Sequence, residues 1–149
     1  VELEGATLTG QAAIADDPDA GGGKAVAFGA PTQAAIENAG SLSLPVDLPP
    51  GTYTLWLRLK GRPEKNTGFF YAQFGDGPEH YSRAQVSSWF SELPWTWHRV
   101  RSMNTVRDPQ EHLMTYTVSR QPTVLTLRHR ANYFAVDRAF LTTNEHETP

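Results

Sequence analysis

The chain has 149 residues, of which 39% are hydrophobic and 19% charged, and its formal net charge is −3. This length suits one domain with its own hydrophobic core, and the composition lies far from that of disordered chains. The slightly acidic balance provides no basic field, so neither nucleic acid nor a membrane surface is expected as a partner. No apolar run approaches the roughly 20 residues of a membrane-spanning helix. The absence of cysteine excludes disulfides and thiolate metal sites.

The predicted elements are short β-strands joined by turns rich in glycine and proline. In chain order, strands are expected over residues 1–8, 23–29, 40–48, 51–61, 69–77, 95–103, 112–119, 122–130 and 133–143. The amphipathic segments 32–39 and 108–114 are too short to be assigned as helices. Many short strands without crossover helices predict an all-β fold, namely an antiparallel β-sandwich with jelly-roll topology.

Within this pattern, the alternation over 51–61 is the clearest strand signal. Tyr53, Leu55, Leu57 and Leu59 should share the inward face, and the residues between them should point outward. The sandwich is expected to fill residues 1–143, and 144–149 are expected to form a polar tail or the start of a linker. Because the chain begins abruptly in a strand-like segment, we expect a monomeric module linked to other domains of a longer protein.

Three acidic residues stand where strands are predicted. Glu2 and Glu4 alternate with apolar residues near the start, and Asp137 lies inside an apolar, aromatic run near the end. They could face water, with Asp137 paired to Arg138 or another arginine, or they could hold a cation. The nearby stretch "DDPDAGG" lacks the spacing of a calcium-binding loop, so a solvated turn is expected there.

Five features in this order resemble the carbohydrate-binding modules of families 6 and 35. They are the E-x-E start, "DPDAGGGKAV", "LPPGTYTLWLRLKG", "WTWHRV" and "TLRHRANYFAVDRAFLT". The resemblance covers almost the whole chain and implies a galactose-binding-like β-sandwich with one structural calcium ion. It further implies that Glu2, Glu4 and Asp137 bind the calcium, together with a backbone carbonyl near Gly23 or Lys24. Calcium prefers six to eight oxygen ligands, which carboxylates and carbonyls supply.

The same resemblance places a glycan site on three loops at one end of the sandwich. Sugar recognition needs flat aromatic faces for the C–H side of a ring and planar polar groups for its hydroxyls. The matching loops supply seven candidates, which are Arg62, Asn66, Trp89, Trp95, Arg130, Asn132 and Tyr133. The chain departs from the family pattern in the first loop, which reads "KGRPEKN", and in the longer spacing from Asn132 to Asp137. Each aromatic candidate could instead pack in the core, and Trp97 is expected to do so.

The predicted function is therefore non-catalytic binding of a polysaccharide or oligosaccharide, which would tether an attached enzyme to its substrate outside the cell. Two alternatives remain open at this stage. A small jelly-roll polysaccharide lyase would need a proton-transfer pair, but the adjacent His80 and Tyr81 should point to opposite faces of a strand. A purely structural or interaction domain of a larger secreted protein would need no site at all.

Overall fold

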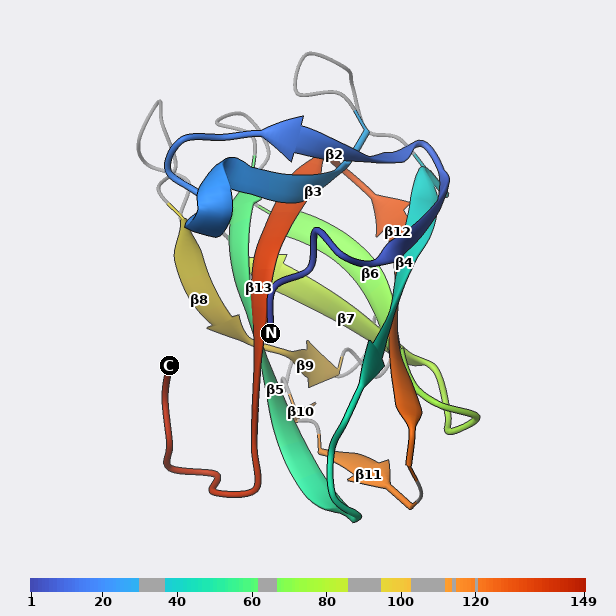
Figure 1. Ribbon diagram of the computed structural model, residues 1–149. Helices are drawn as coiled ribbons and strands as arrows, with labels where there is room; N and C mark the ends of the chain where they lie inside the picture. Colours follow the sequence, from blue (N-terminus) through green and yellow to red (C-terminus); the bar gives the residue numbers. More distant parts are fainter. Residues whose placement is uncertain (30–36, 62–66, 86–94, 103–111, 114, 120) are drawn as a thin grey trace.

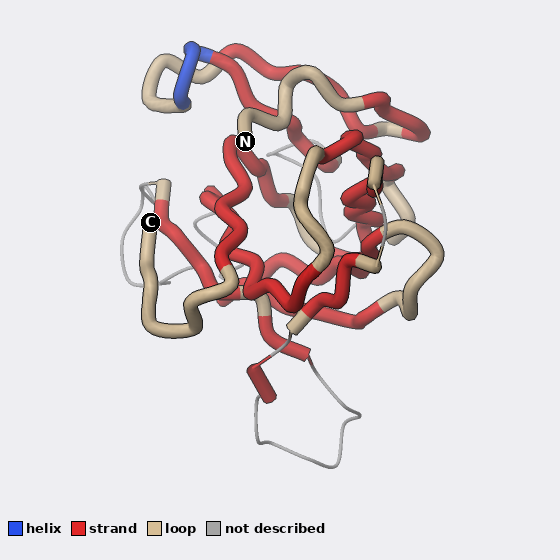
Figure 2. Tube along the Cα trace, turned by 60° about the horizontal axis from the view of Figure 1, so that its bottom comes forward, coloured by secondary structure: helices blue, strands red, loops and turns tan. Residues whose placement is uncertain are grey.

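The computed structural model of the chain describes residues 1–29, 37–61, 67–85, 95–102, 112–113, 115–119 and 121–149. In these residues two antiparallel sheets face each other and no α-helix occurs, which confirms the predicted β-sandwich (Figure 1). One 3₁₀ turn, η1 (Gly21–Gly23), lies at one end of the sandwich, and Figure 2 shows it in blue. No helix in the described part of the chain is long and apolar enough to cross a membrane. Most of the two amphipathic segments lies outside the described residues.

The larger sheet has seven strands. Their order is β1 (Thr7–Gly10), β4 (Gly40–Val46), β12 (Thr123–Ala131), β6 (Thr67–Phe74), β7 (His80–Gln85), β9 (Arg101–Ser102) and β10 (His112–Leu113). Its centre is regular, because Leu125 pairs with both Leu44 of β4 and Phe74 of β6. The neighbours β1, β4, β12 and β6 come from distant parts of the chain, as expected when strands alternate between the two layers of a sandwich, whereas β6 and β7 are consecutive.

The smaller sheet has six strands. Five follow the order β11 (Tyr116–Val118), β5 (Gly51–Gly61), β13 (Phe134–Thr142), β3 (Lys24–Phe28) and β2 (Ala12–Asp16), and β8 (Thr96–Arg99) pairs with β5 beside β11. The start of the chain attaches to this sheet, since the Leu3 N–H donates to the Asp137 carbonyl at 3.1 Å. The N-terminal ammonium group also donates to the Ala139 carbonyl at 2.7 Å. The first residues and the last strand are thus neighbours in space.

The core lies between the sheets and consists of residues that alternate along the strands. Tyr53, Leu55, Leu57 and Leu59 are all buried, which confirms the inward face predicted for β5. Strand β12 shows the same alternation, with Leu125 fully buried among its inward residues. Burial of these aliphatic and aromatic side chains is the main favourable contribution to folding.

Three details differ from the sequence-based expectations. Strands β2 and β7 were not expected, because neither sequence has a hydrophobic alternation. Strand β7 contains mainly polar residues, and the one large hydrophobic residue of β2, Ile14, is exposed. The opening segment forms only an isolated bridge between Glu2 and Arg138 before β1 begins. The core assignment of Trp97 is wrong. Trp97 pairs in register with Arg58, and this register places it on the outer face of the six-stranded sheet.

Candidate functional site

Asp137 occupies an irregular position in β13. The register with β5 shifts between Val136 and Arg138, so Asp137 is the extra residue of a β-bulge. Its side chain is fully buried, where one oxygen accepts a hydrogen bond from the Gly21 N–H at 3.1 Å and forms an ion pair with Arg58. The acid in the apolar run is therefore held by an arginine from the neighbouring strand, as one of the two sequence-based interpretations allowed.

Glu4 lies against the same glycine turn. A Cβ atom added to Gly22 would come 3.3 Å from one carboxylate oxygen of Glu4, so this carboxylate borders η1 as Asp137 does. The other Glu4 oxygen and the second oxygen of Asp137 are both buried without a hydrogen-bond partner in the structure. Buried carboxylate oxygens normally find a donor or a cation. Carboxylate oxygens are ligands that calcium prefers, so these two oxygens fit its chemistry.

Glu2 and Lys24 are arranged differently. Glu2 forms an ion pair with Arg138 at 2.7 Å, and both side chains remain about half exposed. Lys24 is exposed and opposes Asp16 in the β2–β3 register. The Gly23 carbonyl accepts a hydrogen bond from the Asp17 N–H at 3.0 Å, which leaves it a second lone pair. Within the described residues, no group of three or more His, Asp and Glu side chains is gathered as a metal site.

A floor of small residues covers the outer face of the six-stranded sheet near η1. Its buried members are Ala20, Ala25, Ala27 and Ala135, and we call it the alanine floor. Trp95 and Tyr133 pack on this floor and are partly exposed. The two aromatic residues come from segments that are far apart in sequence, one before β8 and the other between β12 and β13. The four alanines are themselves buried, because Trp95, Tyr133 and Ala15 pack on them.

Charged groups border the alanine floor. The Lys60 ammonium lies 5.8 Å and the Arg58 guanidinium 5.6 Å from the centre of a Trp95 ring. Lys60 also forms an ion pair with Asp17 at 2.7 Å. Burial by itself would raise the pKa of Asp17, but hydrogen bonds from Lys60 and from the Asp19 N–H outweigh it and lower that pKa overall. Asp17 is thus a fixed member of this surface and not a residue of a fully solvated turn.

The remaining sequence-based candidates lie elsewhere. Arg130 points outward from the seven-stranded sheet, where it forms an ion pair with Glu37 at 2.8 Å. Asn132 has a φ angle of 62° in the β12–β13 turn, and its carbonyl accepts a hydrogen bond from His129 Nε2 at 2.6 Å. Arg62, Asn66 and Trp89 lie outside the described residues. The structure therefore brings Trp95 and Tyr133 together and places Arg130 on the opposite sheet.

The alanine floor and its charged border were not identified from the sequence as a site. The outward position of Arg58 and Lys60 was predicted from the alternation of β5, and Ala25 and Ala27 alternate with core residues in "KAVAF". Alternating alanines in a strand are thus the signal that could have indicated an outer face on which other side chains pack.

A second aromatic surface lies on the outer face of the seven-stranded sheet. Tyr71 and Tyr81 are directly opposite in register, and their ring centres are 5.3 Å apart. Phe69 extends the stack, with its ring centre 6.1 Å from that of Tyr81. The predicted separation of His80 from Tyr81 is confirmed, because the His80 ring packs inward at 5.6 Å from the buried Tyr116. This pair offers no proton-transfer site.

Comparisons with known proteins identify the fold but no sequence family. No protein-family model and no curated protein matches the chain. Among solved structures, a Paenibacillus sp. cycloisomaltooligosaccharide glucanotransferase is similar with a TM-score of 0.64 and 17% identity, over 97% of this chain but 18% of that one. The exo-β-1,3-galactanase of Phanerochaete chrysosporium gives a TM-score of 0.58 at 12% identity, over 91% of this chain and 28% of that one.

One similar structure has nearly the same length as this chain. It is the module TmCBM61 in complex with β-1,4-galactotriose, with a TM-score of 0.54 and 18% identity, over 96% of this chain and 91% of that one. This chain spans less than a third of the two enzymes above. At these identities the likenesses show the fold alone, an antiparallel β-sandwich that TmCBM61 and parts of the two enzymes share.

Proposed function

We propose that this chain is a non-catalytic carbohydrate-binding module that holds a glycan above the alanine floor. The observation that carries the proposal is the joint placement of Trp95 and Tyr133 on that floor, beside the Lys60–Asp17 ion pair. Flat aromatic faces pack against the C–H side of a pyranose, and charged groups fixed beside them form hydrogen bonds with its hydroxyls. The full-length similarity to a galactotriose-binding module supports the same ligand class.

The module would act by keeping an attached partner near its substrate. In the two enzymes above, the similar region makes up 18% and 28% of the chain, so the parent protein of this chain is proposed to carry further domains. A bound glycan raises the effective concentration of polysaccharide for an enzyme on the same chain without adding a contact at its active site. Because the proposed ligand is an extracellular polysaccharide, we propose that the parent protein is secreted.

A structural calcium ion is part of this proposal, in line with the resemblance to families 6 and 35. Glu4 and Asp137 would bind it through the buried oxygens that lack partners, together with a carbonyl of η1 or Lys24. Glu2 would contribute after exchanging Arg138 for the ion. Such an ion would fasten the start of the chain to β13 and would add its binding free energy to folding stability.

Calorimetric titration of the purified chain tests the glycan site. Suitable probes are β-1,4-galactotriose, β-1,3-galactotriose and cycloisomaltoheptaose, followed by a glycan array. Replacing Trp95 by Ala should weaken binding about thirtyfold, as expected for an aromatic residue central to an interface. Tyr71→Ala is the matched control, because it removes an aromatic ring from the other sheet and should leave the affinity unchanged.

Two results would contradict the proposal. The first is the absence of binding to any glycan on the array by the wild-type chain. The second is glycan binding that survives in Trp95→Ala and Tyr133→Ala but is lost in Tyr71→Ala, which would move the site to the seven-stranded sheet. Incubation with uronate-containing polysaccharides should release no unsaturated ends that absorb in the ultraviolet.

A further inference from the structure

Three of the four tryptophans of the protein lie on the outer face of the six-stranded sheet. Trp95 precedes β8, Trp97 lies in β8, and Trp56 lies in β5, the strand that pairs with β8. Trp56 points outward, because Leu55 and Leu57 on either side of it are fully buried in the core. All three tryptophans are partly exposed. Trp97 and Trp56 therefore extend the aromatic surface beyond the alanine floor.

A cation accompanies each of these tryptophans. Trp97 stands directly opposite Arg58 in the register, and Trp56 stands opposite Arg99. Such cross-strand neighbours have Cβ atoms about 4.5–5.5 Å apart. The Lys60 ammonium lies 5.8 Å from the centre of a Trp95 ring. We call these two parallel rows the tryptophan–cation strip, which consists of Trp95, Trp97 and Arg99 on one side and Lys60, Arg58 and Trp56 on the other.

The tryptophan–cation strip leads away from the alanine floor. Figure 1 shows β8 starting at the end of the sandwich that carries η1 and running beside β5 toward the opposite end. From Trp95 to Arg99 the strip covers about 13 Å, since an extended strand rises about 3.3 Å per residue. It ends at the C-terminal segment, because Arg99 Nη1 donates to the Glu145 carbonyl at 3.3 Å. A surface of this length is longer than one pyranose ring and suits several sugar units in a row.

The cations in the middle of the strip are held in place by acids. Arg58 forms an ion pair with Asp137 and also donates to the Asp19 carbonyl at 3.3 Å. Lys60 forms its ion pair with Asp17 at 2.7 Å. A guanidinium has five N–H donors, more than these two contacts of Arg58 use. Donors that are already fixed can bind sugar hydroxyls at a small cost in side-chain entropy.

We propose that a glycan runs from the alanine floor along the tryptophan–cation strip, so that the protein binds an extended stretch of several sugar units and not a single sugar. This inference rests on the proposed function, because it lengthens the same site. Tryptophan faces pack on the C–H sides of successive rings, and Arg58 and Lys60 donate to the hydroxyls between them. Each further stacked ring removes more apolar surface from water, so affinity should rise with ligand length until the strip is filled.

The test measures affinity against ligand length. Oligosaccharides of one to six units are titrated calorimetrically into the wild-type protein, in three series made of β-1,4-galactosides, β-1,3-galactosides and α-1,6-glucosides. In at least one series, the hexasaccharide should bind about tenfold more tightly than the trisaccharide, as expected for one further aromatic contact. Trp97→Ala should lower the hexasaccharide affinity to that of the trisaccharide and should leave the trisaccharide affinity unchanged.

Two further variants separate loss of contact from damage to the fold. Trp97→Phe keeps an aromatic ring on the strip and should retain most of the dependence on length. A substitution that merely disturbed β8 would weaken the binding of every ligand in the series. Tyr71→Ala is the matched control, because Tyr71 lies on the other sheet, and it should change neither affinity.

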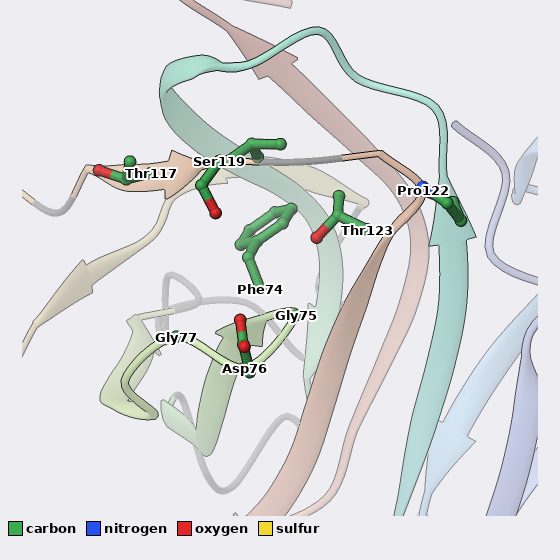
Figure 3. A pocket seen from close by; sticks show the side chains of 9 residues that line it. Phe74, Gly75, Asp76, Gly77, Thr117, Ser119, Pro122 and Thr123 are labelled. Atoms are coloured by element: carbon green, nitrogen blue, oxygen red, sulfur yellow. The ribbon is translucent and has the colours of Figure 1, made fainter.

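A second measurement locates the added sugar units. The rival location is a pocket of about 290 Å³ beside β11, which is formed by the turn after β6, the end of β11 and the start of β12 (Figure 3). In ¹⁵N-labelled wild-type protein, the hexasaccharide should shift the amides of Trp56, Trp97 and Arg99 more than the trisaccharide does. The amides of Gly75 and Ser119, which line the pocket, should not respond to ligand length.

Three results would overturn the proposal. They are an affinity that does not rise with length in any series, a rise that Trp97→Ala retains, and added units that shift the pocket amides instead. Trisaccharide binding that needs Trp95 would still support the proposed function in each of these cases. A wild-type protein that binds no glycan would overturn both proposals, so failure of the function and failure of the extended site are distinguishable.

Discussion

The outer faces of the two sheets both carry aromatic side chains, but they differ in what lies over the rings. On the seven-stranded sheet, the Arg128 guanidinium lies 4.1 Å from the centre of the Tyr71 ring. Glu79 fixes that guanidinium through hydrogen bonds of 2.9 and 2.8 Å. The chain's own cation thus occupies the face of Tyr71, where a sugar would have to stack.

On the six-stranded sheet the cations stand farther from the aromatic ring. Arg58 and Lys60 lie 5.6 and 5.8 Å from Trp95 and are bound to Asp137 and Asp17. The rings of Tyr71 and Tyr81 also pack on each other, whereas Trp95 and Tyr133 pack on the small residues of the alanine floor. The chain's own cations therefore lie closer to the ring of Tyr71 than to the ring of Trp95.

The largest loss of stability should follow from removing Asp137, the buried acid of the six-stranded sheet. Asp137→Ala leaves Arg58 without its partner and should lower the free energy of unfolding by about 3 kcal/mol. Urea denaturation measures the loss, with the exposed Asp47→Ala as control. Calcium should raise the melting temperature of the wild type and not of Asp137→Ala. A wild-type melting curve unchanged by a chelator would contradict the proposed calcium site.

A somewhat smaller loss of stability is expected at His129, which holds the turn between β12 and β13. Its Nδ1 accepts a hydrogen bond from the Ala39 N–H at 2.9 Å, and its ring stacks on Phe28 and Phe134. His129→Phe keeps the stacking but leaves that N–H buried without a partner, which should cost about 2 kcal/mol in chemical denaturation. His146→Phe, at an exposed histidine of the C-terminal tail, should cost nothing measurable.

His129 should also make stability depend on pH. Burial lowers the pKa of His129 in the folded chain below its usual value of 6.5. The unfolded state therefore binds more protons below that pH, so the stabilisation is complete above about pH 6.5 and is lost as the pH falls toward the folded pKa. Denaturation midpoints between pH 5 and 8, a range in which histidine titrates, should show this loss in the wild type and not in His129→Phe. An equal loss in both would assign the effect to other groups.

The charged border of the alanine floor should contribute less. Lys60→Gln removes the partner of Asp17 and should cost about 1 kcal/mol, since both side chains are partly buried. Because the pKa of Asp17 is lowered in the folded chain, its stabilisation is present above about pH 4 and is lost as the pH falls further. The acid limb of a stability–pH curve should therefore flatten in Lys60→Gln. An unchanged acid limb would contradict this assignment.

The smallest loss of stability should come from the outer face of the seven-stranded sheet. Arg128→Ala removes an exposed ion pair and the cation over Tyr71, and it should cost about 0.5 kcal/mol. This variant tests the difference between the two outer faces, because it uncovers the face of the Tyr71 ring. If aromatic availability limits binding, the variant should gain weak glycan binding that Tyr71→Ala,Arg128→Ala lacks. Equal glycan binding by the two variants would show that uncovering the Tyr71 ring is not sufficient for binding.

Some features of the site could be predicted from the sequence, and others could not. The outward position of Arg58 and Lys60 followed from the alternation of β5, and the pairing of Asp137 with an arginine was one of two stated alternatives. The role of Trp97 could not be read correctly, because strand parity gives two faces but does not say which one points inward. That choice depends on the pairing of β8 with β5.

The all-β sandwich and the inward face of its long strands follow from the sequence alone, because hydrophobic alternation and turn residues act locally. Which side chains meet on and between the sheets depends on the tertiary structure. The alanine floor, the Asp17–Lys60 pair and the pocket beside β11 each join segments that are dozens of residues apart. Such meetings depend on strand order and register, which long-range pairing sets and which no local pattern encodes.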